Sequence, residues 1–254
     1  MAYPKKTVKY KSLDTDFISL GEGKLEENYE YFSGKPLWRF KSFLLYRVLA
    51  TPIAFLYTKL FLRDSYVGRE KLKGIKGGYY LFSNHTHELG DAFTPPMLAF
   101  PRKAYVVVHP DNMKLPVIKS GTKYLGAIPT PSTLRQARDF SECVGKRLKE
   151  GCAIAIYPEA RVWKYCSFIR PFAKGAFDTV FKYEAPIFTV TRVYKRSRLF
   201  GFKCVCYIDG PFNVRRDLPR KEAKAELSRL VYSKMLERMK ENEVEIYRYE
   251  EEAE

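Results

Sequence analysis

The chain has 254 residues, of which 46% are apolar and 29% are charged, and this balance excludes a disordered chain. Its length is enough for one α/β domain with a sizeable core. Lysine and arginine number 45 against 29 acidic residues, and the resulting formal charge of +16 exceeds what solubility requires. That excess indicates an anionic partner, such as an anionic membrane, a phosphorylated substrate or nucleic acid.

Five cysteines are scattered along the chain in a pattern that does not favour a disulfide framework. Cys204 and Cys206 would share one face of a strand, but no second close pair completes a zinc site. We therefore expect reduced, mostly buried thiols in a cytoplasmic protein. No apolar run follows the first six residues, so no secretory signal is expected.

Residues 1–38 form a polar arm, and residues 39–66 an apolar and basic segment that is expected to be helical. Arg47 and Lys59 leave eleven uncharged residues between them, or about 17 Å of helix, whereas crossing a bilayer takes roughly 20 apolar residues. Pro52 is also expected to kink or break the helix. The pattern favours one or two helices lying in a membrane interface, with basic side chains that reach lipid head groups. The alternative is a pair of buried core helices.

Strand and helix patterns alternate from residue 67 to residue 245. Apolar runs predict strands at residues 79–83, 104–108, 126–129, 152–157, 186–194 and 203–208. Helical patterns are found at residues 132–149, 177–183 and 220–243. This alternation is typical of a single α/β domain with a largely parallel central sheet flanked by helices, here preceded by the membrane-interface helices. Residues 246–254 form an acidic tail, of which the last five, 250–254, are expected to fray.

Residues 84–93, Asn-His-Thr-His-Glu-Leu-Gly-Asp-Ala-Phe, hold two of the three histidines at a predicted strand-to-helix junction. α/β folds place reactive side chains at such junctions, because the scaffold is rigid and the loop is exposed. An imidazole that donates one N–H to a carboxylate is held in one tautomer and becomes a better base. We interpret His85 as that base and Asp91 as the carboxylate that orients it. The alternative is a surface histidine that lies near an aspartate without a function.

A second cluster of polar residues follows the predicted strand at 152–157. Glu159 and Arg161 come directly after the strand, and Arg170, Lys174 and Gly175 follow a short loop. Arginine offers a forked contact to phosphate and lysine a point charge, while glycine permits close approach of a ligand or simply closes a turn. We expect these residues to bind a phosphate-bearing substrate, and the alternative is an exposed basic loop. The next candidates for phosphate contacts are Lys103, Lys119 and Arg135.

Together, the two clusters resemble the motifs of the glycerol-phosphate and lysophospholipid acyltransferases. That family has Asn-His with an aspartate five residues after the histidine, and later Phe-Pro-Glu-Gly-Thr-Arg followed by a Phe-Lys-x-Gly stretch. The matching pieces are Asn84-His85 with Asp91, Tyr157-Pro158-Glu159 with Arg161, and residues 171–177, while residues 125–129 and 185–187 look like the second and fourth motifs. Two spacings depart from the family: Asp91 lies six residues after His85, and the stretch from Glu159 to Arg161 is one residue shorter.

The resemblance implies an O-acyltransferase of phospholipid synthesis. His85 would take the proton from a hydroxyl of a lysophospholipid such as lysophosphatidic acid, and the alkoxide would attack an acyl thioester, either acyl-CoA or acyl carrier protein (acyl-ACP). The resemblance implies no metal and no bound cofactor. The expected location is the cytoplasmic side of a membrane, as a peripheral or monotopic protein on an anionic phospholipid surface, and no nucleic acid partner is expected.

Three alternatives stay open on the sequence. His87 could be the base in place of His85, because it lies four residues before Asp91 and the two would meet on a helical turn. His85, His87 and Asp91 could instead be ligands in a metallohydrolase. A non-catalytic protein that binds anionic membranes or nucleic acid would explain the charge, but not the placement of the histidine and the aspartate.

Overall fold

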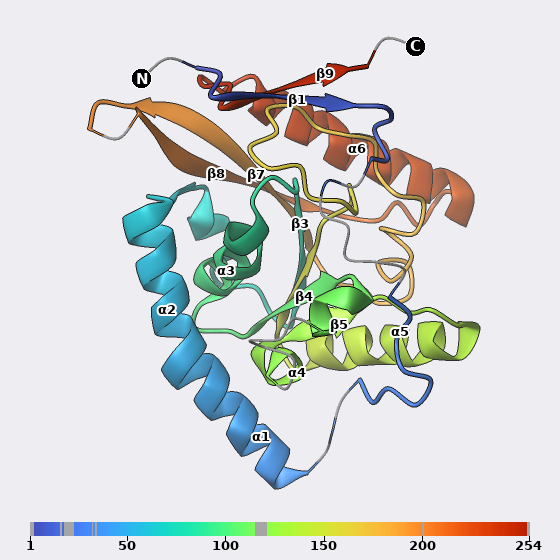
Figure 1. Cartoon of the computed structure of the whole chain (residues 1–254). Helices are drawn as coiled ribbons and strands as arrows, with labels where there is room; N and C mark the ends of the chain where they lie inside the picture. The colour runs from blue at the N-terminus through green and yellow to red at the C-terminus, as the bar shows by residue number, and fades with distance from the viewer. Residues whose placement is uncertain are drawn as a thin grey trace.

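The computed structural model describes residues 3–15, 17, 23–31, 33, 35–114, 121–199 and 201–252. A seven-stranded sheet runs through its centre in the order β2-β8-β7-β3-β6-β4-β5 (Figure 1). Its strands are β2 (Ser65–Val67), β3 (Tyr79–Ser83), β4 (Ala104–Val108), β5 (Ala127–Pro129), β6 (Ala153–Ile156), β7 (Ile187–Ser197) and β8 (Gly201–Phe212). Among these described strands, β7 and β8 form the one antiparallel pair. The predicted α/β fold with a largely parallel sheet is therefore confirmed.

Both faces of the sheet are covered. The helices of this part are α3 (Glu88–Ala99), α4 (Thr122–Leu125), α5 (Leu134–Lys149) and α6 (Arg220–Met239), with short 3-10 helices η3 (Arg69–Leu72) and η4 (Pro110–Lys114). Alternate residues of β3 point to opposite faces, so that Tyr80 and Phe82 pack with α5 and α6, while Tyr79 and Leu81 pack with α3. We call these the α5/α6 face and the α3 face. Burial on both faces explains why the central strands are continuous apolar runs.

Two predicted helical segments differ in the structure. Residues 177–183 are a series of turns and not a helix, with bonds such as Val180 N to Phe177 O (3.2 Å) that span three residues. α6 ends at Met239 and not at residue 243. The backbone N–H groups of Glu243 and Val244 both donate to Tyr194 O on β7, so the chain leaves the helix to join the sheet.

The two ends of the described chain pair with each other. β9 (Tyr247–Glu251) runs parallel to β1 (Lys6–Tyr10), and they form a separate two-stranded sheet. The expectation that the last five residues fray is therefore wrong for Glu250 and Glu251, because this segment is held by a strand from the N-terminal arm. Figure 1 shows this small sheet lying over α6 and the β7–β8 hairpin.

The apolar segment forms one continuous helix of 26 residues, Pro36–Phe61, which we call the apolar helix. It consists of α1 (Pro36–Phe43), η1 (Leu44–Ala50), α2 (Thr51–Leu56) and η2 (Tyr57–Phe61), where η1 and η2 are π-helical. Pro52 does not break it, contrary to expectation. The wider turns of η1 accommodate the proline, since the Thr51 N–H already bonds five residues back to Tyr46 O.

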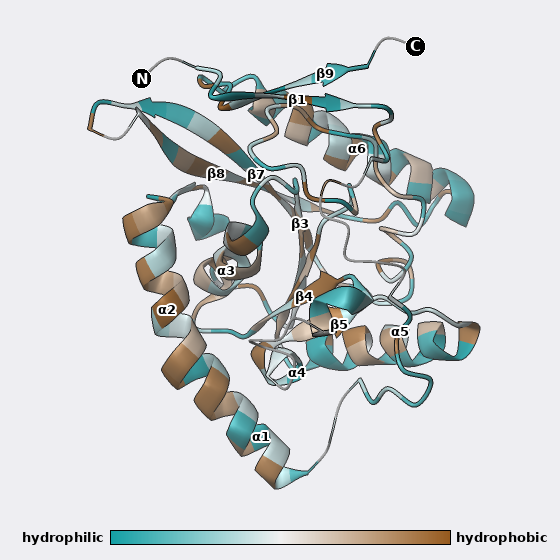
Figure 2. Cartoon of the chain, in the orientation of Figure 1, coloured by the Kyte–Doolittle hydropathy of each residue, from teal (hydrophilic) through white to brown (hydrophobic). Residues whose placement is uncertain are grey.

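The apolar helix turns its apolar side chains outward (Figure 2). The buried residues at its inner face include Ser42, Tyr46 and Thr58, and two of these bond the domain: Ser42 Oγ donates to Tyr124 O (2.8 Å), and Ala104 N donates to Tyr46 Oη (2.9 Å). The exposed residues are Leu37, Phe40, Phe43, Leu44, Val48, Leu49, Ile53, Phe55, Leu56, Leu60 and Phe61. Among the described residues, this is the one helix that is long and apolar enough to cross a membrane, by length and composition.

Candidate active site

The site begins where β3 and β6 end side by side. Asn84 follows β3 and is fully buried. Its Nδ2 donates to Arg192 O (3.0 Å) and its Oδ1 accepts from Arg192 N (2.8 Å), so this side chain continues the pairing with β7. The loop beyond is fixed by two backbone bonds, from Trp163 N to His85 O (3.1 Å) and from Tyr165 N to Thr86 O (2.8 Å). His85 therefore lies in a rigid loop at the carboxyl edge of the sheet.

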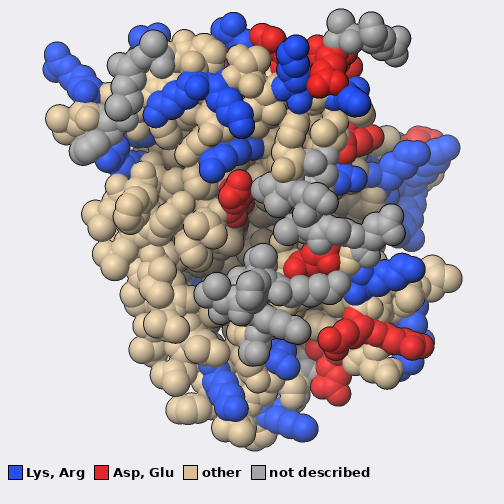
Figure 3. All heavy atoms as spheres, viewed as in Figure 1, with Lys and Arg blue, Asp and Glu red and all other residues tan. Residues whose placement is uncertain are grey.

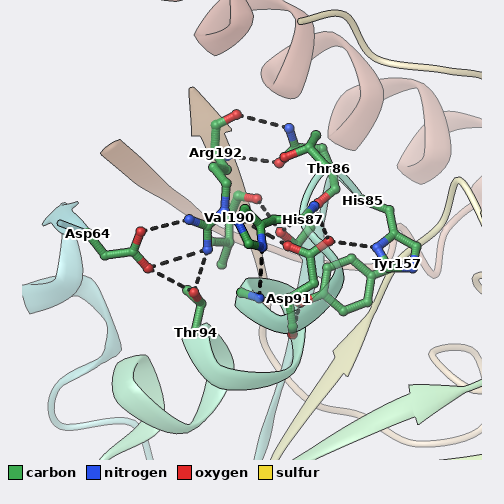
Figure 4. Close-up of polar contacts among 12 residues, drawn as sticks. Asp64, His85, Thr86, His87, Asp91, Thr94, Tyr157, Val190 and Arg192 are labelled. Atoms are coloured by element: carbon green, nitrogen blue, oxygen red, sulfur yellow. Dashed lines mark hydrogen bonds and ion pairs between the residues drawn. The ribbon is translucent and has the colours of Figure 1, made fainter. Parts of the chain in front are cut away.

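His85 and Asp91 meet across this loop (Figure 4). The Nδ1 atom of His85 lies 2.6 Å from Asp91 Oδ2, and the same oxygen accepts the His87 backbone N–H at 3.0 Å. Asp91 is buried in the first turn of α3, whereas 21% of the His85 side chain is exposed. The imidazole stacks on Tyr157, with ring centroids 4.5 Å apart, and the Tyr157 hydroxyl donates to the Asp91 backbone carbonyl. Since a carboxylate only accepts, the proton stays on Nδ1 and the lone pair on Nε2 is free.

His87 has a different environment. It is the N-cap of α3, and its Nδ1 accepts the backbone N–H of Gly90 at 3.1 Å. The absence of a side chain at Gly90 permits this cap, because a Cβ there would lie 2.8 Å from Leu62 and 3.0 Å from His87 Nδ1. Burial, together with the positive charge of Arg192, lowers the pKa of His87 to about 4, although Asp91 opposes the shift. The His87 side chain is thus a neutral, buried cap.

Glu159 and Arg170 form a buried ion pair and do not present their side chains to a substrate, which corrects the expectation for these two residues. Arg170 Nη2 lies 2.6 Å from Glu159 Oε2, and both side chains are almost completely buried. Glu159 also accepts the His85 backbone N–H at 3.3 Å, and the Arg170 guanidinium lies 4.8 Å from the Trp163 ring centre. Burial raises the pKa of Glu159, and Arg170 limits that rise. The pair supports the His85 loop from behind.

Arg161, Lys174 and Gly175 are exposed. The Ala173 N–H donates to Pro158 O at 2.7 Å, so the turns that contain Lys174 and Gly175 start beside the end of β6. A Cβ at Gly175 would meet only the Asp178 carboxylate, at 3.6 Å, so no close packing requires glycine in this structure. Of the five residues expected to bind phosphate, the structure leaves the two cations Arg161 and Lys174 at the surface.

The secondary phosphate candidates fall in three different places. Lys103 donates to Ser42 Oγ (2.7 Å) and Tyr124 O (2.9 Å). Burial, with help from Arg147, lowers its pKa to about 7. Arg135 is exposed on α5, and Lys119 lies outside the described residues. Lys103 is thus a half-buried link between the apolar helix and the domain.

An acyltransferase family model matches residues 65–193, more than half of the chain and including both polar clusters. The chain belongs to the acyltransferase family. A solved structure with a similar fold is that of the 1-acyl-sn-glycerophosphate (LPA) acyltransferase PlsC from Thermotoga maritima, with a TM-score of 0.51 and 15% identity. That match covers 80% of this acyltransferase and 95% of PlsC. No curated protein sequence gives a significant match.

The sequence did not point to three residues of this acyltransferase that lie behind the His85–Asp91 pair, which we call the dyad. Arg192 on β7 binds Asp64 through two nitrogens, at 2.7 and 3.3 Å, and also donates to Thr94 Oγ1 (Figure 4). All three are buried. One signal was present, since an arginine in the middle of a buried apolar strand needs a buried anion. Asp64 lies 128 positions away, and no local pattern identified it as that anion.

The charged residues of this acyltransferase are spread unevenly over its surface, and its cysteines lie inside. Figure 3 shows lysines and arginines at the upper edge, over the β7–β8 hairpin and β1, at the right over α6 and at the lower end of the apolar helix, while the rest of the surface along that helix is largely uncharged. All five cysteines are free and buried, as expected. Within the described ranges, no group of three or more histidine, cysteine or acidic side chains could hold a metal ion.

Proposed function

We propose that this acyltransferase moves a fatty acyl group from a thioester, acyl-CoA or acyl-ACP, to a hydroxyl of a lysophospholipid such as lysophosphatidic acid. The observation that carries the proposal is the bond of 2.6 Å between His85 Nδ1 and buried Asp91, on an imidazole that is partly exposed. This geometry supports a base at Nε2 that is oriented by a carboxylate. The printed name of PlsC, an LPA acyltransferase, supports this acceptor class.

His85 carries the proton through the proposed reaction. Nε2 takes the proton from the acceptor hydroxyl while the oxygen attacks the thioester carbonyl, and a tetrahedral intermediate forms. When this intermediate collapses, the carbon–sulfur bond breaks and the proton passes from His85 to the leaving thiolate. Asp91 stabilises the imidazolium between these steps, and general-base help of this kind contributes roughly 10²- to 10⁴-fold. The thioester supplies the activated acyl group, so the reaction requires no metal and no bound cofactor.

We propose Arg161 and Lys174 as the contacts to the acceptor phosphate. Both are exposed cations that follow the end of β6, on the same edge of the sheet as the loop that holds His85. Glu159 and Arg170 instead hold that loop in place through the His85 backbone. Changing Arg161 to Ala should raise the KM for the acceptor more than the KM for the thioester, because the contact is made equally in ground and transition states.

We further propose that the apolar helix lies along a membrane surface, on the cytoplasmic side, as a peripheral or monotopic anchor. Its inner face packs against the domain along its length, including α3 and α4, so it is not free to cross a bilayer alone. Two of its four cations also fold back, since Arg47 donates to Pro101 O and Lys59 Nζ donates to Asp64 O at 3.0 Å. The other two, Arg39 and Lys41, are exposed near the start of the helix. The outer face is left apolar, and the net charge of +16 favours anionic lipids over a role in binding nucleic acid.

The test is a reaction panel. The purified protein is incubated with acyl-CoA or acyl-ACP and with each of several lysophospholipids and glycerol phosphate, and the products are identified by mass. We expect thioester consumption that depends on a lysophospholipid and yields its acylated form. Consumption that is independent of every acceptor would indicate a thioesterase, and no consumption with any pair would contradict the proposal.

A further inference from the structure

A buried charge cluster lies directly behind the dyad, on the α3 face (Figure 4). Arg192 is 2% exposed and Asp64 is 3% exposed, and their side chains form two nitrogen–oxygen contacts. Thr94 Oγ1 closes the cluster, because it donates to Asp64 Oδ2 at 2.9 Å and accepts from Arg192. Burial is the largest influence and by itself would lower the pKa of Arg192, but the neighbouring groups, with Asp64 first and Asp91 among them, together outweigh burial and raise that pKa, so the arginine stays charged.

Asp91 stands between this cluster and His85. Its Oδ2 faces the His85 imidazole at 2.6 Å, and its Oδ1 lies 3.9 Å from Arg192 Nε. A buried carboxylate is costly unless a cation or hydrogen bonds compensate it, and Arg192 is the cation that faces its second oxygen. The carboxylate is thus held from both sides and cannot turn away from His85 without losing one contact.

The cluster and Asp91 together carry a net negative charge beside His85. Asp64 and Asp91 carry two negative charges against the one positive charge of Arg192. Uptake of a proton by His85 therefore neutralises a net negative buried group. If Arg192 were not bound by Asp64, its full charge would act on Asp91 and would oppose the imidazolium.

The other groups around His85 do not alter this balance. Glu159 and Arg170 face its backbone and pair with each other. Tyr157 stacks on the ring, and burial raises the pKa of its hydroxyl well above the usual value, so it stays neutral. His87 is a neutral cap, and at the surface Lys164 is paired with Glu88 at 4.0 Å.

We propose that the Asp64–Arg192 pair is a positioning device for the dyad, in which Arg192 faces Asp91 and Asp64 balances the charge of Arg192, so that this charge does not oppose the imidazolium of His85. This inference rests on the proposed function, in which His85 carries a proton during acyl transfer. Asp64 also follows the apolar helix directly, and its N–H donates to Thr58 O at 2.8 Å. The device thus joins the end of that helix to the dyad.

NMR of the histidine rings tests this without substrate, since the chain has three histidines and their signals can be assigned by single replacements. The whole protein in detergent is titrated as wild type, Asp64→Asn, Arg192→Met and the double variant. In Asp64→Asn, we expect the midpoint of the His85 titration to fall by roughly one pH unit or more, and in Arg192→Met to rise. The double variant should return near the wild-type midpoint.

Asp209→Asn is the matched control. Asp209 is also a buried carboxylate, bound by Arg238 (2.7 Å) and Lys71 (3.1 Å), on β8. Its loss should leave the His85 midpoint unchanged. If the variants with Arg192→Met do not fold, the inference is tested by comparing the His85 midpoint in Asp64→Asn, where it should fall, with that in Asp209→Asn, where it should not change.

The inference would be overturned if no variant changed the His85 midpoint. It would also be overturned if both single variants shifted the midpoint in the same direction, because a merely loosened site moves the midpoint toward that of a free histidine in either variant. A failure of this kind, with acyl transfer intact, would leave the proposed function standing. If the two single variants shift the His85 midpoint in the expected opposite directions but the protein transfers no acyl group, the role of the Asp64–Arg192 pair is supported and the proposed function is contradicted.

Discussion

Both faces of the sheet bury apolar side chains, but they differ in where their charged groups lie. On the α5/α6 face, helices bury leucine, valine and methionine side chains and expose most of their charged residues, as in α6 with buried Leu227, Val231 and Met235. On the α3 face, charges and hydroxyls are inside, with Arg192 and Asp64 beneath the dyad, and the apolar helix exposes its apolar side. The first face is stabilised by burial from water. The second holds charge near His85 and leaves the outer side of the apolar helix exposed.

The largest expected effect is a difference in the free energy of unfolding between a substitution in the α5/α6 face and one on the outer side of the apolar helix. Leu227→Ala removes a leucine that is 2% exposed, and we expect a loss of about 2–5 kcal/mol from the free energy of unfolding. Leu49→Ala on the apolar helix, at 54% exposure, should change it by less than about 0.5 kcal/mol. Urea unfolding in detergent measures both. Equal losses would mean that the outer face of the apolar helix is packed against protein.

The α3 face should also be weakened by acid through His87. Its folded pKa of about 4 lies below the unfolded value of roughly 6.5, so the imidazole is neutral when folded and takes a proton on unfolding. Stability from this group is complete above pH 6.5 and is lost as the pH falls toward 4. Between pH 7 and pH 4.5 we expect about 2–3 kcal/mol from His87. His87→Asn, which keeps an N-cap residue, should lack this part of the acid sensitivity, and an identical pH profile would contradict the burial of a neutral His87.

Membrane binding should depend on the outer face of the apolar helix. Leu49→Asp places a charge there, and we expect binding to anionic vesicles to fall roughly 10- to 100-fold, which corresponds to the transfer of one leucine. Leu134→Asp is the control, because Leu134 is 93% exposed at the start of α5 and the substitution adds the same charge. Equal losses in both would assign the effect to charge alone. Undiminished binding by Leu49→Asp would contradict the proposed surface.

A smaller effect is expected at the strand end between the two faces. Ala160 has a φ of +63°, in the left-handed region that favours glycine, in a tight turn closed by the bond from Arg161 N to Glu159 O (2.7 Å). Ala160→Gly should therefore stabilise the fold by about 1 kcal/mol, seen as a higher Tm. Ala173→Gly, at an exposed position without a positive φ, should lower the Tm slightly. A lower Tm in both would show that the turn is unstrained.

Local patterns were enough to predict most of the fold. The strands at residues 79–83 and 104–108 and the helix at 132–149 are set by runs of apolar residues and their spacing, and the structure reproduces them within two residues. Partners distant in the sequence were not predictable in this way. The tail forms a strand because β1, more than 200 residues earlier, pairs with it. Pro52 fits a helix because the preceding turns are wide, which its sequence does not indicate.

The same limit applies to the site. His85 and Asp91 are six residues apart, so a strand-to-helix junction was enough to suggest that they meet. The exposed or buried state of a charge depends on partners that no local pattern specifies. Glu159 and Arg170 were therefore assigned to a substrate although they bind each other, and Asp64 was missed although it lies beside the dyad.

The most direct test of the account compares His85→Asn with His87→Asn, both checked for folding by circular dichroism and assayed for acyl transfer. The substitution is the same, the positions are two residues apart, and asparagine can still cap α3 at position 87. We predict that His85→Asn loses at least about a hundredfold in kcat, the low end for the loss of a general base, while His87→Asn keeps most of its activity. Full activity in His85→Asn, or the reverse pattern, would contradict the assignment of His85 as the base.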